Sequence, residues 1–91
     1  ADNVWLSTAY DQPCATISVH QGIDSEDEPL FRACEEVFRE YGGRPHWGKV
    51  HFQNGEELAA VHPRWADWWR VRDLWDPDGR FLNDHLAAWR P

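Results

Sequence analysis

The fold of this chain is decided by residues 15–41, which read ATISVHQGIDSEDEPLFRACEEVFREY. At the start of this stretch polar and apolar residues alternate, with the β-branched residues Ile17 and Val19 on one face. A period of two with branched side chains predicts a β-strand over residues 15–20. Gly22 and the acidic residues that follow it end the predicted strand in a solvated loop.

The second half of the same stretch follows a different period. Between Pro29 and Tyr41 the apolar side chains recur at steps of three and four, which predicts an amphipathic helix. Pro29 suits the first turn, where its missing N–H is not needed, and Gly42-Gly43 provides the stop. The rest of the chain predicts, in order, a strand or extended segment at 44–52, a helical turn from 54, a helix from 63, a turn at 76–79 and a short helix at 83–89.

Together these elements predict an α+β fold with a small, partial antiparallel sheet and packed helices. No linker, repeat or low-complexity segment divides residues 1–91, so they are expected to form a single lobe. Seven Trp, four Phe and two Tyr supply enough apolar surface for one compact core. A two-stranded sheet is marginal by itself, so the pattern also indicates that neighbouring strands are missing.

The charge of the chain argues against several classes of partner. Sixteen acidic residues against nine basic ones give a formal net charge of −7. Nucleic acids and anionic membranes attract Lys and Arg, so neither is an expected partner. No apolar run reaches the roughly 20 residues that span a bilayer, and no signal peptide is visible at the start.

Cys14 and Cys34 are too few for a disulfide framework, and as two buried free thiols they favour a reducing, cytoplasmic location.

The densest group of polar and aromatic residues lies at 44–51, which read RPHWGKVH. Lys49 is the only lysine of the chain and follows Gly48, where the backbone can turn or approach another group closely. A fixed ammonium group can stabilise an anion that develops beside it during a reaction. The alternative is a surface lysine at the end of a strand, and the residues alone leave both hypotheses open.

The aromatic residues and the histidines raise two rival sites. Trp65, Trp68, Trp69 and Trp75 are spaced along one side of a predicted helix, which is typical of a core or of a contact with another domain. The alternative is the exposed aromatic platform of a non-catalytic carbohydrate-binding or interaction module, and the solvent exposure of the rings distinguishes the two. The histidines and cysteines lack the paired spacing of a zinc site, so no metal is expected.

Three motifs, taken together, carry a resemblance to a known family. Residues 44–49 (RPHWGK) resemble the HWGK signature near the C-terminus of the aldonolactone oxidases, which include gulonolactone, galactonolactone and arabinonolactone oxidases and alditol oxidase. Residues 62–65 (HPRW) and 71–83 (VRDLWDPDGRFLN) are similar to the closing pattern of that family. Residues 5–20 resemble the strand segment that precedes the signature in alditol oxidases. The matches occur in the family's order and cover nearly the whole chain.

The resemblance implies part of a flavoprotein of the vanillyl-alcohol-oxidase type. Such proteins have an N-terminal FAD-binding domain and a C-terminal cap domain that forms the substrate site over the flavin. This chain would supply the C-terminal part of the cap and the tail that returns to the FAD-binding domain of the parent polypeptide. The parent would oxidise a sugar-1,4-lactone or an alditol by hydride transfer to FAD. The FAD domain and the upstream Glu-x-Arg pair of alditol oxidases are absent from the sequence, so the chain is expected to be inactive by itself.

The resemblance also implies roles for three residues. Lys49 matches the signature lysine, which lies near the flavin and would stabilise its reduced form as a catalytic, cofactor-binding residue. His20 matches a strand histidine of the alditol oxidase pocket and would bind a substrate hydroxyl or act as acid or base. His46 would bind substrate or, as an equally open alternative, orient Lys49. Gly22 replaces a hydroxyl residue of the alditol oxidase pattern, which supports a lactone substrate at least as well as a polyol.

Overall fold

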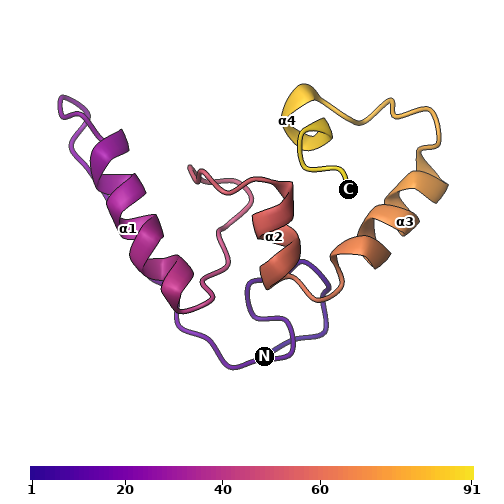
Figure 1. Ribbon diagram of the computed structural model, residues 1–91, viewed down its shortest axis with the longest axis horizontal. Coiled ribbons are helices and arrows are strands. Elements are labelled where there is room, and N and C mark those ends of the chain that lie inside the picture. The colour runs from indigo at the N-terminus through magenta and orange to yellow at the C-terminus, as the bar shows by residue number, and fades with distance from the viewer.

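The computed structural model describes residues 1–91 and contains four helices, α1 (Glu28–Glu40), α2 (Gly55–Val61), α3 (Trp65–Trp75) and α4 (Asp84–Ala87). In Figure 1 they form an open V, with α1 in one arm, α3 and α4 in the other, and α2 between them. The chain measures 42 × 30 × 18 Å. Its radius of gyration of 14.6 Å exceeds the roughly 12 Å of a compact domain of this length. None of the four helices has the length and apolar composition needed to cross a membrane.

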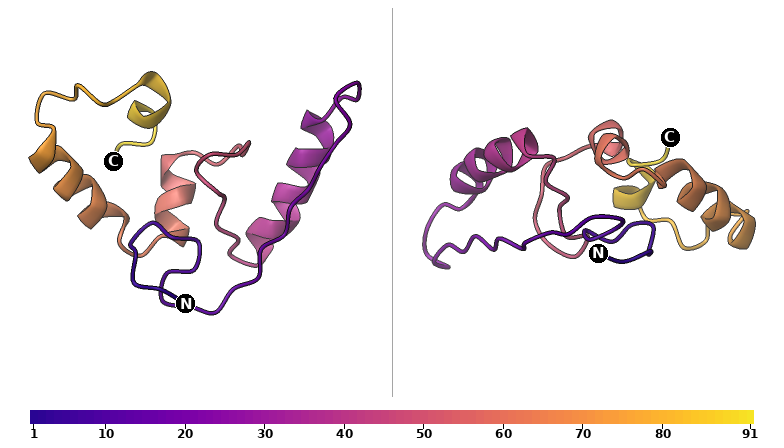
Figure 2. Two further views of the ribbon diagram at one scale, coloured as in Figure 1. Left: turned by 180° about the vertical axis from the view of Figure 1, so that it is seen from behind. Right: turned by 90° about the horizontal axis from the view of Figure 1, so that it is seen from below.

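The predicted α+β fold with an antiparallel sheet is wrong, because the chain forms helices and no sheet. Its single β-bridge joins Asp2 to Tyr10, outside both predicted strands. Residues 15–20 make no backbone hydrogen bond, and Figure 2 shows this part of the chain running along α1. Residues 44–52 form a turn at 47–49 and have no regular secondary structure on either side of it. A strand is stable only when a neighbour pairs with its N–H and C=O groups, and no segment of this chain supplies that neighbour.

Helix α1 has the ends that its sequence predicts. Pro29 lies in the first turn, and the chain leaves the helix through Gly42, whose φ of 67° lies in the left-handed region. The N–H groups of Gly42 and Gly43 donate to the carbonyls of Arg39 and Phe38, which forms a Schellman motif. The apolar stripe of α1 has no residue that is fully buried. The helix is therefore well formed locally but covered on no side by a core.

The core lies in the other arm of the V. Four buried apolar side chains form it, and five partly buried ones pack around them. The buried side chains are Leu58, Trp65, Trp69 and Trp89, and the surrounding ones are Leu6, Trp47, Trp68, Leu82 and Leu86. The compact core expected from the aromatic content is thus confined to α2, α3 and the C-terminal residues.

Helix α2 begins with a capping box and receives the C-terminal end of the chain. The Asn54 side chain accepts the N–H of Glu57, and the Glu57 carboxylate accepts the N–H of Asn54. A Cβ atom at Gly55 would lie 2.8 Å from the carbonyl oxygen of Trp89 and 2.9 Å from its Cα. Glycine is therefore required at position 55 so that the backbone around Trp89 can approach α2.

Asp76 holds the turn that follows α3. Its buried carboxylate accepts the N–H of Arg80 at 2.7 Å and that of Phe81 at 3.0 Å, and it pairs with the guanidinium of Arg72. Burial alone raises the pKa of Asp76, but these donors outweigh burial and keep the pKa below its ordinary value. The turn predicted at 76–79 is confirmed, with the N–H of Gly79 donating to the carbonyl of Asp76 at 3.1 Å.

Helix α1 is joined to the rest of the chain mainly by polar contacts. Arg39 pairs with Glu57 of α2, and the Glu35 carboxylate accepts the N–H of Phe52 at 2.9 Å. The guanidinium carbon of Arg32 lies 3.9 Å from the centre of the Phe52 ring. Polar contacts between partly exposed groups each contribute about 1 kcal/mol or less. This arm is consequently held less firmly than the tryptophan-rich arm.

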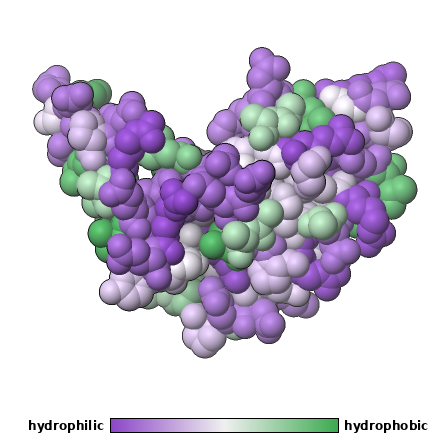
Figure 3. Space-filling view, in the orientation of Figure 1, coloured by the Kyte–Doolittle hydropathy of each residue, from purple (hydrophilic) through white to green (hydrophobic).

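Large apolar side chains remain on the surface of both arms. Tyr41 is 85% exposed, Trp75 87% and Phe81 84%. Figure 3 shows apolar atoms at several separate places on the face it draws. Side chains of this size that are almost fully exposed are available for contact with another domain.

We expect the substitution Gly55→Ala to destabilise the chain by about 1–3 kcal/mol, because the added methyl group collides with backbone atoms that cannot rotate away. The free energy of unfolding, measured by urea titration with tryptophan fluorescence as the probe, checks this. Glu56→Ala, at the exposed neighbouring position of the same helix, is the control and should change it by less than about 0.5 kcal/mol. Equal stability of the two variants would contradict the packing described here.

Candidate functional site

The predicted site at residues 44–51 is built around one indole ring. Trp47 stacks on Trp65 with 5.7 Å between ring centres and meets Trp89 edge-on at 5.2 Å. Its Nε1–H donates to the carbonyl of Leu6 at 3.0 Å, so packing and a hydrogen bond both hold the ring. Trp47 therefore fixes the middle of the segment in the core and leaves the residues on either side at the surface.

Trp47 is the second residue of a tight turn. The N–H of Lys49 donates to the carbonyl of His46 at 3.0 Å, and the N–H of Gly48 donates to Nδ1 of the same histidine at 3.0 Å. The turn brings together two of the three predicted site residues, His46 and Lys49, and both are exposed. Their proximity follows from four residues of local sequence and needs no other part of the chain.

Arg44 fixes the same segment at its N-terminal end. Its guanidinium donates to the carbonyl of Val61 at 2.7 Å and to that of Tyr10 at 2.9 Å. Carbonyl groups in the last turn of a helix carry partial negative charge, so Val61 of α2 is a suitable partner for a cation. Arg44 thereby joins the N-terminal loop, α2 and the segment that leads into the turn.

Lys49 carries a positive charge that no other group of the chain neutralises. Every arginine except Arg44 forms an ion pair with Asp or Glu, and Arg44 is bound by carbonyl groups. Lys49 takes part in no ion pair, although the chain has a formal charge of −7. An exposed, unpaired cation is available to an anionic group from outside the chain. Exposure alone does not separate a ligand-binding lysine from a solvated one, so the role of Lys49 stays a prediction.

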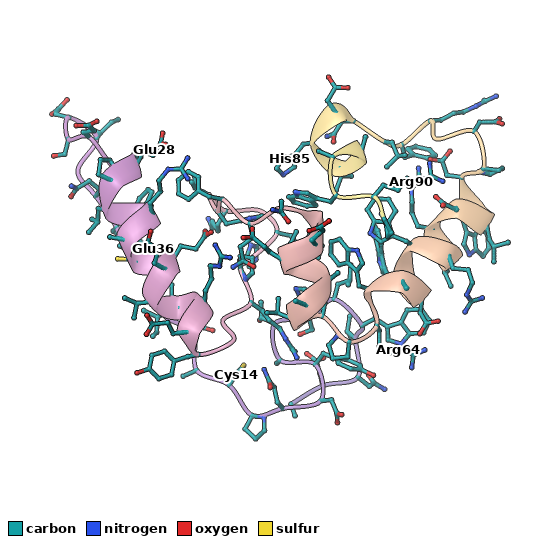
Figure 4. All side chains as sticks on the ribbon, in the orientation of Figure 1. Cys14, Glu28, Glu36, Arg64, His85 and Arg90 are labelled. Carbon is teal, nitrogen blue, oxygen red and sulfur yellow. The ribbon has the colours of Figure 1, made fainter.

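His20 lies in a different part of the structure. It is exposed in the extended segment that runs along α1, and no hydrogen bond or ring contact joins it to His46 or Lys49. The two arms are shown again in Figure 4, where Glu28 and Glu36 mark α1 and His85 marks α4. The 91 residues by themselves thus leave His20 apart from the turn, and a shared pocket for His20 and Lys49 stays a prediction.

Two histidines that the sequence does not single out as site residues have strongly altered surroundings. His62 is 1% exposed, stacks on Trp65 at 6.1 Å, and has no hydrogen-bond partner at either ring nitrogen. Burial, helped by the positive charge of Arg44, lowers the pKa of His62 to about 4. Burial also lowers the pKa of His51. The nearby carboxylate of Glu35 raises this pKa, but the effect of burial is larger. Tertiary packing creates these surroundings, so no spacing along the sequence could have revealed them.

The remaining polar clusters offer no metal site, and the groove that they line is open to solvent. No group of three or more His, Cys, Asp or Glu side chains could hold a metal ion. A shallow groove between α1 and residues 52–57 is lined mostly by Glu and Arg side chains, of which Arg39 and Glu57 pair with each other. Cys34 is half-buried but Cys14 is exposed, so the prediction of two buried thiols is wrong for Cys14.

The tryptophan stripe of α3 is part of the core and forms no exposed platform. Trp65 and Trp69 are buried, and Trp68 is partly buried against Trp69 with ring centres 5.1 Å apart. Trp75 alone among the four is exposed. A single exposed ring does not make an aromatic binding surface, so the stripe gives no support to a carbohydrate-binding module.

The sequence matches the family of D-arabinono-1,4-lactone oxidases over residues 1–89. An L-gulono-1,4-lactone dehydrogenase of Mycobacterium tuberculosis is 48% identical over 84 residues, which cover 92% of this chain and 20% of the relative. An L-gulonolactone oxidase of Mus musculus is 35% identical over 89 residues (93% and 20%), and an alditol oxidase of a Streptomyces species is 33% identical over 88 residues (93% and 21%). The chain thus spans about a fifth of the length of these curated relatives. No solved structure matches it.

The buried His62 makes the stability of the chain depend on pH. Its pKa is about 4 when folded, against 6.5 ordinarily, so protonation favours unfolding. Above about pH 6.5 the histidine is neutral in both the folded and the unfolded chain, so it does not change the free energy of unfolding. As the pH falls from about 6.5 towards about 4, protonation of the unfolded chain lowers that free energy.

Replacing His62 with Phe removes the titrating group and two buried nitrogens without partners. We expect the free energy of unfolding of the His62→Phe variant to be at least that of the parent chain at pH 7. Between pH 6.5 and 4 the free energy of unfolding of the variant should fall less steeply with pH than that of the parent chain. The difference between the two slopes should be at most about 1.4 kcal/mol per pH unit. Urea titrations at several pH values check this, and an unchanged slope would contradict the assignment.

Proposed function

The chain belongs to the D-arabinono-1,4-lactone oxidase family, and we propose that it is the C-terminal part of the cap domain of a longer FAD-dependent oxidoreductase. The whole polypeptide oxidises an alcohol carbon of a sugar-1,4-lactone or an alditol. The printed names of the relatives, which are lactone dehydrogenase, lactone oxidase and alditol oxidase, support this substrate class. Since the chain spans about a fifth of the length of those relatives, we propose that it is inactive in isolation.

The observation that carries the proposal is the unpaired Lys49 on an anchored turn. A bound FAD would supply the acceptor for a hydride from the alcohol carbon, and negative charge would develop on the flavin as a result. A nearby cation stabilises that charge, and it acts best when its position is fixed before the reaction. Lys49 fits this task because Trp47 anchors its turn in the core and no carboxylate neutralises its ammonium group.

The proposed role of His20 is to place the substrate hydroxyl. The imidazole is exposed and free of hydrogen bonds within the chain, so both of its nitrogens are available to a ligand. A neutral imidazole can accept the proton of the substrate hydroxyl while the carbon that bears this hydroxyl gives up a hydride. Together the two transfers complete the two-electron oxidation of the alcohol. Because His20 lies along α1 and Lys49 in the turn after it, the FAD-binding domain would have to seat both segments on one substrate.

The exposed apolar side chains support a large partner surface. Tyr41 after α1 and Trp75 and Phe81 around the turn after α3 are almost fully exposed. Burying one such side chain stabilises a contact by roughly 1.5–3 kcal/mol. We propose that the FAD-binding domain and the rest of the cap domain of the same polypeptide cover these side chains.

The direct test is the anaerobic addition of substrate to the full-length polypeptide purified with its flavin. L-gulono-1,4-lactone, D-arabinono-1,4-lactone or an alditol should bleach the visible absorption band of the oxidised flavin within the time of mixing and turnover. Re-oxidation by dioxygen, compared with an artificial acceptor, then shows which acceptor is used. A flavin that none of these substrates reduces, or a purified polypeptide without flavin, would overturn the proposed function.

Replacing Lys49 in the same polypeptide tests the residue that carries the proposal. We expect Lys49→Ala to lower the rate of flavin reduction by roughly 10²–10³-fold, as for other residues that stabilise developing negative charge. Lys49→Arg keeps the charge and should retain more of the rate. Arg80→Ala removes an exposed cation elsewhere and is the control, which should leave the rate unchanged. Unchanged flavin reduction in Lys49→Ala would remove this role.

A further inference from the structure

His46 holds the turn through its side chain as well as through its backbone. Its carbonyl accepts the N–H of Lys49, as in an ordinary turn, and its Nδ1 accepts the N–H of Gly48 at 3.0 Å. The second bond satisfies a backbone donor that the turn alone leaves free. Asp and Asn side chains form the same bond to the N–H two residues on, and it fixes the backbone between the two residues.

The hydrogen bond also determines where the imidazole proton lies. A ring nitrogen that accepts an N–H bond must carry a lone pair, so Nδ1 is unprotonated and the neutral ring bears its proton on Nε2. Nε2 of His46 is then a donor, and the ring cannot take a proton there while Nδ1 stays an acceptor.

The imidazole ring packs against the backbone as well as bonding to it. A Cβ atom placed on Gly48 would lie 3.4 Å from Cε1 of His46, which shows how closely the ring covers this residue. On the other side, Trp47 is locked against Trp65 and bonded to the carbonyl of Leu6. The backbone that leads into Lys49 is therefore held by the ring of His46 and by the anchor of Trp47.

We propose that His46 is a positioning residue for Lys49. It acts through the bond from Gly48 N–H to Nδ1, which sets the direction in which the Lys49 side chain leaves the turn. The inference rests on the proposed function, because it matters only where the Lys49 ammonium must meet a reacting group. Of the two roles left open for His46, orienting Lys49 is the one proposed, and direct binding of substrate by the ring is the alternative.

Two substitutions separate these roles. In His46→Asn the side-chain Oδ1 stands where Nδ1 stood, so the bond to Gly48 N–H is kept while Nε2 is lost. In His46→Phe a ring of similar size remains but the acceptor is lost. Because the side chain is exposed, His46→Gln, whose acceptor lies one bond further out, replaces the Phe variant if that variant fails to fold.

The experiment uses the full-length flavoprotein and measures kcat, KM and the midpoint potential of the bound flavin. We expect His46→Phe to lower kcat by about tenfold to a hundredfold, the effect of a misplaced catalytic group, with little change in KM. The midpoint potential of the bound flavin should be lowered, as in Lys49→Ala. His46→Asn should restore most of kcat and most of the midpoint potential. Combining His46→Phe with Lys49→Ala should cost no more than Lys49→Ala alone.

Each contrary result has a separate meaning. If His46→Asn is as impaired as His46→Phe and the loss is in KM, the ring contacts substrate directly and the positioning role is overturned. If His46→Phe behaves like the parent protein, the bond to Gly48 is irrelevant to Lys49 and the inference also fails. If Lys49→Ala itself has no effect while the His46 variants do, the proposed role of Lys49 fails, which the measurement on Lys49→Ala alone identifies.

Discussion

The packing of the Trp47 indole is the interaction on which the rest of the structure depends. The ring touches Trp65 of α3 and Trp89 near the C-terminus, and its N–H reaches the carbonyl of Leu6 in the N-terminal loop. Three segments that are far apart in the sequence therefore meet on one side chain. An aromatic cluster of this kind combines a large buried apolar area with defined ring geometry, so it fixes position as well as contributing stability. Because Trp47 belongs to the turn at 46–49, this cluster also fixes the position of the turn.

The arm formed by α1 is stabilised mainly by local hydrogen bonds and not by core packing. Its hydrogen bonds and caps are local, and they make the helix without help from the core. Its apolar stripe, however, is only partly covered by the 91 residues, and its links to α2 are polar. The outcome is an open molecule in which one arm is packed and the other carries uncovered apolar surface. That contrast is the structural counterpart of a chain that spans about a fifth of the length of its relatives.

Features that depend on neighbours in sequence could be predicted, and features that depend on pairing in space could not. The apolar period and Gly42 predicted α1, and Asn54 predicted the start of α2, because helices satisfy their hydrogen bonds within one segment. The strand at 15–20 was predicted from its alternation, but a strand needs a neighbour that the sequence pattern cannot guarantee. For the site, the close placing of His46 and Lys49 follows from local sequence. The burial of His62 and the anchor of Trp47 do not, because they arise from tertiary contacts.

The central claim is that this segment completes a flavin-dependent active site formed with the rest of a longer polypeptide. A segment exchange tests it most directly: residues 1–91 replace the matching segment of the L-gulono-1,4-lactone dehydrogenase of Mycobacterium tuberculosis, to which they are 48% identical. The measurement is reduction of the bound flavin by L-gulono-1,4-lactone, compared with the same dehydrogenase without its segment. The account predicts that the exchanged protein keeps its flavin and is reduced by the lactone, whereas the shortened protein is not. A folded, flavin-bound exchange protein that the lactone cannot reduce would contradict it.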